Sequence, residues 1–131
     1  MLELKTIKSE AISSSLEMAK RYRLLGEPDE SESICLDILA VAPDHQEVLT
    51  TLLLALTDKF ADSGLNPSFA EALQTVDKLD SDYCKSYYSG IVFERRAKYH
   101  LRQSQPGSGG LAYEWFVKAM EAFDQAMEGC D

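Results

Sequence analysis

Two apolar stripes of helical spacing, joined by a glycine and a proline, dominate residues 11–44 and constrain the fold more than any other feature. Apolar residues recur every three or four positions over 12–25, which places them on one face of an α-helix. Gly26 ends that helix, because glycine adopts the left-handed cap conformation at no steric cost. Pro28 suits the first turn of a second helix, since the N–H that proline lacks would have no partner there. Two helices joined this tightly are predicted to lie antiparallel.

A second pair of helices is predicted by the same reasoning. Pro43 stops the second helix, and Asp44 can cap a third, expected over about 44–62. This third helix is apolar over so much of its circumference that we expect other helices to cover it on two sides. Asn66 and Pro67 then restart the chain as a fourth helix, with a cap followed by a proline.

The last two predicted helices are longer. The fifth begins at a cap within 80–82 and reaches about Gln103, and the sixth follows the loop 104–110. Gly90 in the middle of the fifth helix weakens it by about 1 kcal/mol relative to alanine, which makes sense if another helix crosses close by. The sequence thus predicts an all-α single domain, 1–131, of about six helices in three antiparallel pairs, approximately 9–42, 44–79 and 82–128.

Particular positions in the first pair and in the last helix carry a repeat signature. The positions are Ser15, Met18, Ala19, Tyr22, Ser31, Cys35 and Pro43, followed in the last helix by Ala112, Phe116 and Ala119. Their spacing resembles the tetratricopeptide repeat (TPR), a unit of about 34 residues with the pattern W-x2-L-G-x2-Y, A-x3-F, P. Ser15 departs from the usual aromatic residue, and Cys35 is smaller than the usual ring.

The resemblance implies a TPR-like right-handed superhelix, in which the first helix of each pair lines a concave groove. It also implies an adaptor or assembly factor that binds a peptide or helix of another protein there, without catalysis. The family's groove-facing slots correspond to Leu16, Lys20, Arg23, Thr50, Leu54, Thr57, Tyr87, Ile91, Glu94 and Arg95.

These groove residues combine aliphatic and aromatic groups with a few cations, on a chain whose formal net charge is −9. Such a groove suits an extended or helical peptide with apolar anchors and a carboxylate or acidic residue. Family members that clamp a C-terminal carboxylate use Lys, Asn and Arg residues across three repeats. Lys20 and Arg95 are present, but Asn66 is the only asparagine and lies outside the groove slots, so that clamp is not predicted.

The last helix carries apolar residues on more than one face. No further apolar stripe follows it in the sequence, so we expect its outer face to stay uncovered by this chain. Exposed aromatic and methionine surfaces of this kind mark interfaces. The hypothesis is that Trp115, Phe123 and Met127 contact a partner protein or a second copy in a homodimer.

Composition excludes several classes of function. The net charge of −9 argues against nucleic-acid binding, which depends on Lys and Arg. The longest apolar run, 52–56, is far shorter than the roughly 20 residues of a membrane span, and the N-terminus lacks a signal-peptide pattern. The three cysteines include no CxxC pair, which favours a reducing, cytoplasmic location and gives no sign of a metal or cofactor.

Two alternative functions stay open. A dedicated chaperone that masks an apolar segment of one client would suit the small, acidic chain. A small-molecule or anion pocket could instead combine Tyr87 and Arg95 with the glycine loop 107–110, although the loop lacks the Lys and Ser or Thr of a phosphate loop. His45 and His100 have no nucleophile at a recognisable spacing, so no catalytic residue is predicted.

The run 94–96 allows two interpretations. Glu94, Arg95 and Arg96 lie on a helix with little polar surface, so they either form structural ion pairs between helices or line a ligand pocket, with a guanidinium stacked on rings.

Overall fold

The computed structural model describes residues 2–63, 65 and 67–128, and the side chains of 2–7, 62 and 63 lie outside this description. Every regular element within the described residues is a helix, which confirms the predicted all-α class. The elements are α1 (Leu2–Leu24), α2 (Pro28–Val41), α3 (Gln46–Asp58), the short α4 (Phe60–Ser63), α5 (Ser68–Asp77), α6 (Asp82–Gln103) and α7 (Ser108–Glu128).

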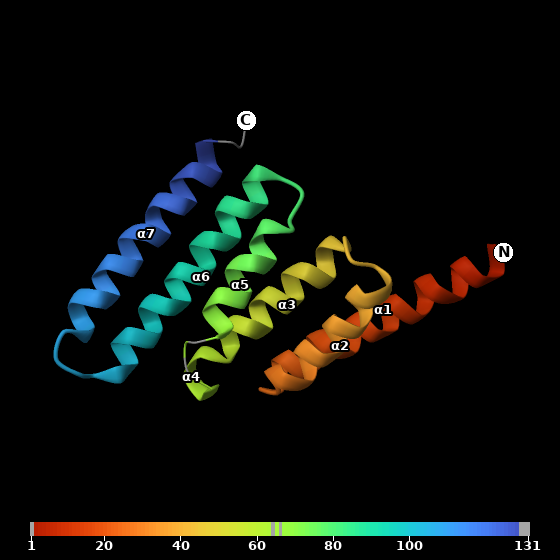
Figure 1. The fold of residues 1–131 in the computed structure, drawn as a ribbon, viewed down its shortest axis with the longest axis horizontal. Coiled ribbons are helices and arrows are strands. Elements are labelled where there is room, and N and C mark those ends of the chain that lie inside the picture. Colours follow the sequence, from red (N-terminus) through yellow and green to blue (C-terminus); the bar gives the residue numbers. More distant parts are fainter. Residues whose placement is uncertain (1, 64, 66, 129–131) are drawn as a thin grey trace.

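The helices follow one another across the molecule in chain order (Figure 1). The pairs are α1 with α2, α3 with α5, and α6 with α7, and each pair packs on the next through α2 against α3 and α5 against α6. The first helices of the three pairs are also neighbours, because α3 contacts both α1 and α6. This arrangement of consecutive helix pairs is that of a helical-repeat fold.

The first turn forms as the sequence predicts. Gly26 has a positive φ of 79°, and the N–H of Glu27 donates to the carbonyl of Tyr22 at 2.9 Å, which closes the end of α1. Pro28 is the first residue of α2. Helix α1 nevertheless begins at Leu2 rather than near residue 9, since no glycine or proline precedes Gly26 to stop it.

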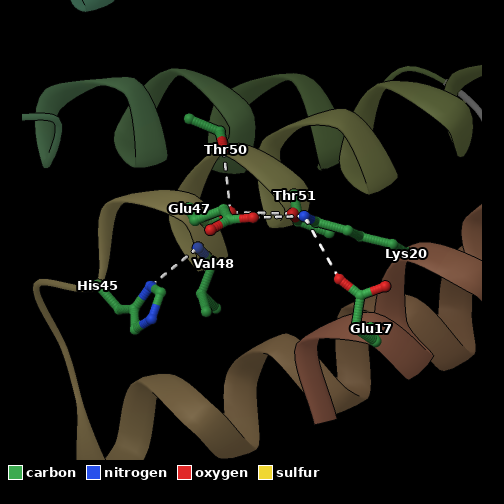
Figure 2. Close-up of polar contacts among 7 residues, drawn as sticks. All are labelled: Glu17, Lys20, His45, Glu47, Val48, Thr50 and Thr51. Carbon is green, nitrogen blue, oxygen red and sulfur yellow. Dashed lines mark hydrogen bonds and ion pairs between the residues drawn. The ribbon is translucent and has the colours of Figure 1, made fainter. Parts of the chain in front are cut away.

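The caps of later helices differ in part from expectation. His45, not Asp44, caps α3, and its Nδ1 accepts a hydrogen bond from the backbone N–H of Val48 at 3.3 Å (Figure 2). Helix α6 is capped by Ser81, whose Oγ accepts from the N–H of Cys84 at 3.0 Å, one of the three caps that the sequence allows. Asn66 lies outside the described residues.

Helix α3 forms the centre of the core. Val48, Leu53 and Ala55 are fully buried, as expected for a helix that contacts α1, α2, α5 and α6. The partners that complete the core come from every pair and include Leu16, Ala19, Cys35, Ile38, Ala72, Val76 and Val92.

Helix α7 packs on α6 through small residues. Ala112, Ala119 and Ala126, spaced by seven, are buried, and Gly90 of α6 is covered by the ring of Phe123. A Cβ atom at position 90 would lie only 2.6 Å from Cε1 of that ring. The glycine therefore lets α7 approach closely, as its position in the middle of α6 predicts.

Candidate partner-binding groove

Side chains from α1 and α3 enclose the first part of a groove. Lys20, Arg23 and Leu24 of α1 face Thr50 and Leu54 of α3 across a hollow of about 350 Å³. Four of these five residues were predicted from the sequence as groove residues, and the structure brings them together. Leu24 was not, although its side chain is among the most exposed apolar groups of the chain.

The groove continues from this hollow toward α6. A second hollow of about 350 Å³ shares Arg23 and Leu24 with the first and reaches Asp58 at the end of α3. A third, of about 290 Å³, shares Asp58 with the second and extends to Arg95 and Arg102 of α6. Because adjoining hollows share lining residues, they form one continuous surface over the first helices of the three pairs.

Asp58 ties the two sides of this surface together. Its Oδ2 lies 2.7 Å from Nε of Arg23 in α1, and its Oδ1 lies 3.5 Å from Nη1 of Arg95 in α6. Both arginines project from helices that flank α3, and their side chains are partly exposed. One carboxylate thus connects the first and third helix pairs through the second.

At the other end of the groove, Lys20 forms an ion pair with Glu47 and lies 3.9 Å from Glu17 (Figure 2). The hydrogen bond to Glu47 raises the pKa of Lys20 and lowers the pKa of Glu47. The hydroxyls of Thr50 and Thr51 both donate to the carbonyl of Glu47 (Figure 2). The cation is therefore held in place at the α1–α3 junction.

Two predicted groove residues lie deeper than expected. Leu16 is only 4% exposed, belongs to the core cluster and lines none of the three hollows. Thr57 is also 4% exposed, and its hydroxyl donates to the carbonyl of Leu54 at 2.7 Å, although the residue still lines the third hollow. Leu16 is thus a structural residue beneath the groove.

Tyr87, predicted as the first groove residue of α6, lines none of the three hollows. Tyr88, by contrast, packs against the central core, and burial raises the pKa of Tyr88. Tyr87 lies toward α7, where its ring is 5.8 Å from that of Phe123. Ile91 is half-buried and lines none of the three hollows.

The α6 end of the groove is basic. Arg95, Lys98 and Arg102 recur at three and four residues and line the third hollow beside Tyr99, with Asp58 opposite. Glu94 does not face this hollow but pairs with Lys98 at 3.1 Å along the helix. Three cations and one carboxylate therefore line a hollow on an acidic chain.

Arg96 occupies a different environment from its neighbour Arg95. Its guanidinium lies 4.0 Å from the ring centroid of Trp115 and 4.4 Å from that of Phe69. Burial lowers the pKa of Arg96, and its Nε donates to Nε2 of His100 at 3.3 Å. Arg95 forms the ion pair between helices that the first interpretation of the run 94–96 predicts. Arg96 is stacked on rings, as in the second, but these rings belong to α5 and α7, and Arg96 lines none of the three hollows.

The glycine loop is not part of the groove. Residues 108–110 form the first turn of α7, and Ser108 Oγ accepts a hydrogen bond from the N–H of Gln105 at 3.1 Å. The glycine loop follows the last residue of α6, Gln103. Tyr87 lies near the other end of this helix, roughly 24 Å from Gln103 along the axis at 1.5 Å per residue. The structure therefore does not bring Tyr87, Arg95 and the glycines into one pocket.

The three residues that the sequence assigned to an outer surface of α7 lie in different places. Trp115 packs on Phe69 and Phe93, and Phe123 covers Gly90, so both rings are half-buried within the fold. Met127 is 74% exposed, and it shares its stripe with the exposed Met120 and Tyr113. The spacing of apolar residues on α7 could not reveal which aromatic rings point toward α6.

Several groove residues were missed by sequence reasoning. Nothing in the sequence distinguishes Asp58 and Glu47 from the other acidic residues of the chain. The recurrence of Arg95, Lys98 and Arg102 at helical spacing was the available signal for a basic surface on α6. The family's groove-facing slots end at Arg95, so they do not include Lys98 and Arg102.

Comparisons of the chain with protein-family models, with curated proteins and with solved structures found no match. The resemblance to the TPR therefore stays a prediction from the spacing of residues, and the structure shows an all-α fold of consecutive helix pairs. None of the helices described within residues 2–128 combines the length and the apolarity needed to cross a bilayer. The described side chains include no cluster of three or more His, Cys, Asp or Glu residues that would suit a metal ion.

Proposed function

We propose that the chain is a TPR-like protein-interaction module that holds a peptide or helix of a partner protein in the groove formed by α1, α3 and α6. In this role it is an adaptor or assembly factor without catalysis of its own. The observation that carries the proposal is the continuity of the three hollows, which join Lys20 at one end to Arg102 at the other through Arg23 and Asp58.

The composition of the groove indicates the chemistry of the bound segment. Leu24 and Leu54 offer apolar contacts at the α1–α3 end, whereas Arg95, Lys98 and Arg102 offer cations at the α6 end. A segment with apolar residues followed by an acidic residue or carboxylate would match both parts. A dedicated chaperone for one client would use the same groove, so the two roles differ in the client rather than in the site.

The experiment is affinity capture from the native source with the intact chain, followed by mass spectrometry. Two groove variants, Leu24→Glu and Arg102→Glu, change exposed side chains and should leave the fold intact. Leu36→Glu is the matched control, because Leu36 is exposed on α2, beside a hollow that faces α5. We expect the same captured protein with the wild type and with Leu36→Glu, and its loss with both groove variants. Loss with Leu36→Glu alone would place the site on the other face.

A second candidate, an anion site, is favoured by the three cations of the α6 hollow. Thermal shift with inorganic phosphate, citrate and ATP tests it directly. Stabilisation by one of these anions in the wild type, lost in Arg102→Glu and kept in Leu36→Glu, would favour a small-molecule site over a peptide groove. No shift with any of them would leave the protein-binding role as the better supported one.

A further inference from the structure

A second surface, next to the groove on α6, exposes apolar side chains on α6 and α7. On α7, Tyr113, Met120 and Met127 are spaced by seven residues and are 71%, 65% and 74% exposed. On α6, the exposed ring of Tyr83 stacks on Tyr87, with the centroids 6.0 Å apart, and Tyr87 in turn contacts Phe123 of α7. These residues, Tyr83, Tyr87, Tyr113, Met120, Phe123 and Met127, form one apolar surface across both helices, here called the end face.

On α6, the end face points away from α5. Arg96 marks the side of α6 that faces α5, because it lies over Phe69. Nine residues separate Tyr87 from Arg96, which places them half a turn apart around the helix. Helix α7 lies at one edge of the molecule, opposite the edge formed by α1 and α2 (Figure 1). Within the described residues, no helix packs on the end face.

The earlier helix pairs show what such a surface can hold. Helix α3 packs on the pair α1–α2, and helix α6 packs on the pair α3–α5, so each of these pairs binds a further helix. At the first of these junctions, Lys59 at the end of α3 lies 2.7 Å from Glu32 and 3.4 Å from Asp29 of α2. The ion pairs raise the pKa of Lys59, with the hydrogen bond to Glu32 as the main cause. At this junction a cation at the end of the added helix meets carboxylates on the second helix of the pair. At the next junction Arg95 of α6 meets Asp58 on the first helix of the pair.

Helix α7 offers the same charge pattern beside its apolar stripe. Glu121, Asp124 and Glu128 are exposed on the solvent side of Met120 and Met127. Lys118 is the cation of this helix, and its Nζ lies 4.2 Å from the ring of Trp115, on the other side of α7 from Asp124. The edge of the end face is thus acidic, as the edge of α2 is.

We propose that the end face binds an amphipathic helix of a partner protein, with apolar residues on Met120, Phe123 and Met127 and with lysine or arginine opposite Glu121, Asp124 and Glu128. A second copy of this chain is a poorer occupant, because its own end face carries the same carboxylates and would oppose like charges. On α6 the end face adjoins the groove, because Lys98 follows Tyr87 by about three helical turns and so lies on the same side of the helix. The residues of α7 distinguish the end face from the groove.

The test uses three fluorescein-labelled synthetic peptides of 14 residues and the intact chain, with fluorescence anisotropy as the readout. The first peptide has leucines at helical spacing and lysines along one flank. The second replaces those lysines with glutamates, and the third is a scrambled version of the first. Of the three peptides, we expect only the lysine peptide to bind tightly. Equal binding of the scrambled peptide would show attraction to an acidic chain only and would overturn the proposal.

Two variants locate the binding site. Met120→Gln should lower the affinity for the lysine peptide by at least about tenfold. Leu36→Gln, an equivalent change at an exposed apolar residue of α2, should leave this affinity unchanged. The double charge reversal Glu121→Lys with Asp124→Lys should lower the affinity for the lysine peptide and allow the glutamate peptide to bind. Equal effects of Met120→Gln and Leu36→Gln would contradict the proposal. So would a dimer in light scattering that Met120→Gln converts to a monomer, which would identify a second copy as the occupant.

Discussion

The carboxylate of Asp58 lies 2.7 Å from Nε of Arg23, so the end of the central helix α3 is joined to the last turn of α1 by an ion pair. The same carboxylate lies 3.5 Å from Nη1 of Arg95 in α6. Three helices that are distant in the sequence thus meet at one acidic side chain in the floor of the groove. This contact both stabilises the array and limits how much positive charge the groove presents.

Asp58→Asn is predicted to lower the free energy of unfolding by about 1 to 2 kcal/mol, because two partly buried arginines would lose their charged partner. Urea denaturation followed by circular dichroism measures the change. Arg23→Gln should have an effect of similar size, and the double variant should cost less than the sum of the two, since both changes break the same pair. Additive losses would indicate that Asp58 and Arg23 stabilise the fold independently.

Much of the fold was predictable because short-range physics decides it. The apolar spacing over 12–25, the left-handed Gly26 and the first-turn Pro28 each specify one local conformation, and the structure confirms them. Helix starts were less predictable, because several residues compete for a cap. His45 displaced Asp44 in this way at the start of α3.

The groove was only partly predictable, for a reason that lies in long-range contacts. Lys20, Arg23, Thr50 and Leu54 were found because the repeat spacing fixes which side of a helix faces inward. Asp58, by contrast, matters through partners that lie 35 and 37 residues away in the chain. The position of Tyr87 beside Phe123 of α7, and not in the hollows, likewise depends on how α6 is rotated against its neighbours, which the glycine at 90 does not determine by itself.

Gly90→Ala is predicted to destabilise the protein although alanine favours helices. The helix preference would contribute about 1 kcal/mol in favour of alanine. The added methyl group would lie 2.6 Å from the ring of Phe123, and overpacking of this kind costs about 1 to 3 kcal/mol. The net loss, up to about 2 kcal/mol, can be measured by thermal and urea denaturation.

A second variant distinguishes this steric cause from a general loss of packing. In a Phe123→Leu background the smaller side chain should leave room for the methyl group, so Gly90→Ala should become neutral or stabilising. If Gly90→Ala destabilises both backgrounds equally, the contact between position 90 and the ring is not the reason for the glycine.

The Cys35 thiol is predicted to make stability fall at alkaline pH. Burial raises the pKa of this thiol from 9.0 in its ordinary range to about 11 in the folded protein. The unfolded chain therefore loses the thiol proton first, and between pH 9 and pH 11 the folded state binds more protons than the unfolded state. Stability contributed by the neutral thiol is complete below pH 9 and falls by about 2 kcal/mol as the pH reaches 11.

The comparison that checks this uses Cys35→Ala under reducing conditions. The variant should be less stable at pH 7 by about 1 kcal/mol, because it removes buried volume. The difference in free energy of unfolding between the wild type and the variant should shrink and then change sign toward pH 11. The contributions of Lys20, Lys59 and Tyr88 cancel in this difference, because both proteins contain these residues. A constant difference from pH 7 to pH 11 would mean that the folded thiol titrates at its ordinary pKa.

The stacking of Arg96 between Phe69 and Trp115 leads to the last prediction, which uses the single tryptophan of the chain as its reporter. Arg96→Ala removes both the cation over two rings and the aliphatic stem that covers them, so it should cost about 2 kcal/mol and shift the Trp115 emission to longer wavelength. Arg96→Met keeps an unbranched stem without the charge, and it should restore the emission while recovering only part of the stability. Arg96→Lys keeps the charge but loses the planar stacking, so its stability should lie between that of the alanine variant and that of the wild type. If alanine leaves both the emission and the stability unchanged, Arg96 does not hold α6 against α5 and α7.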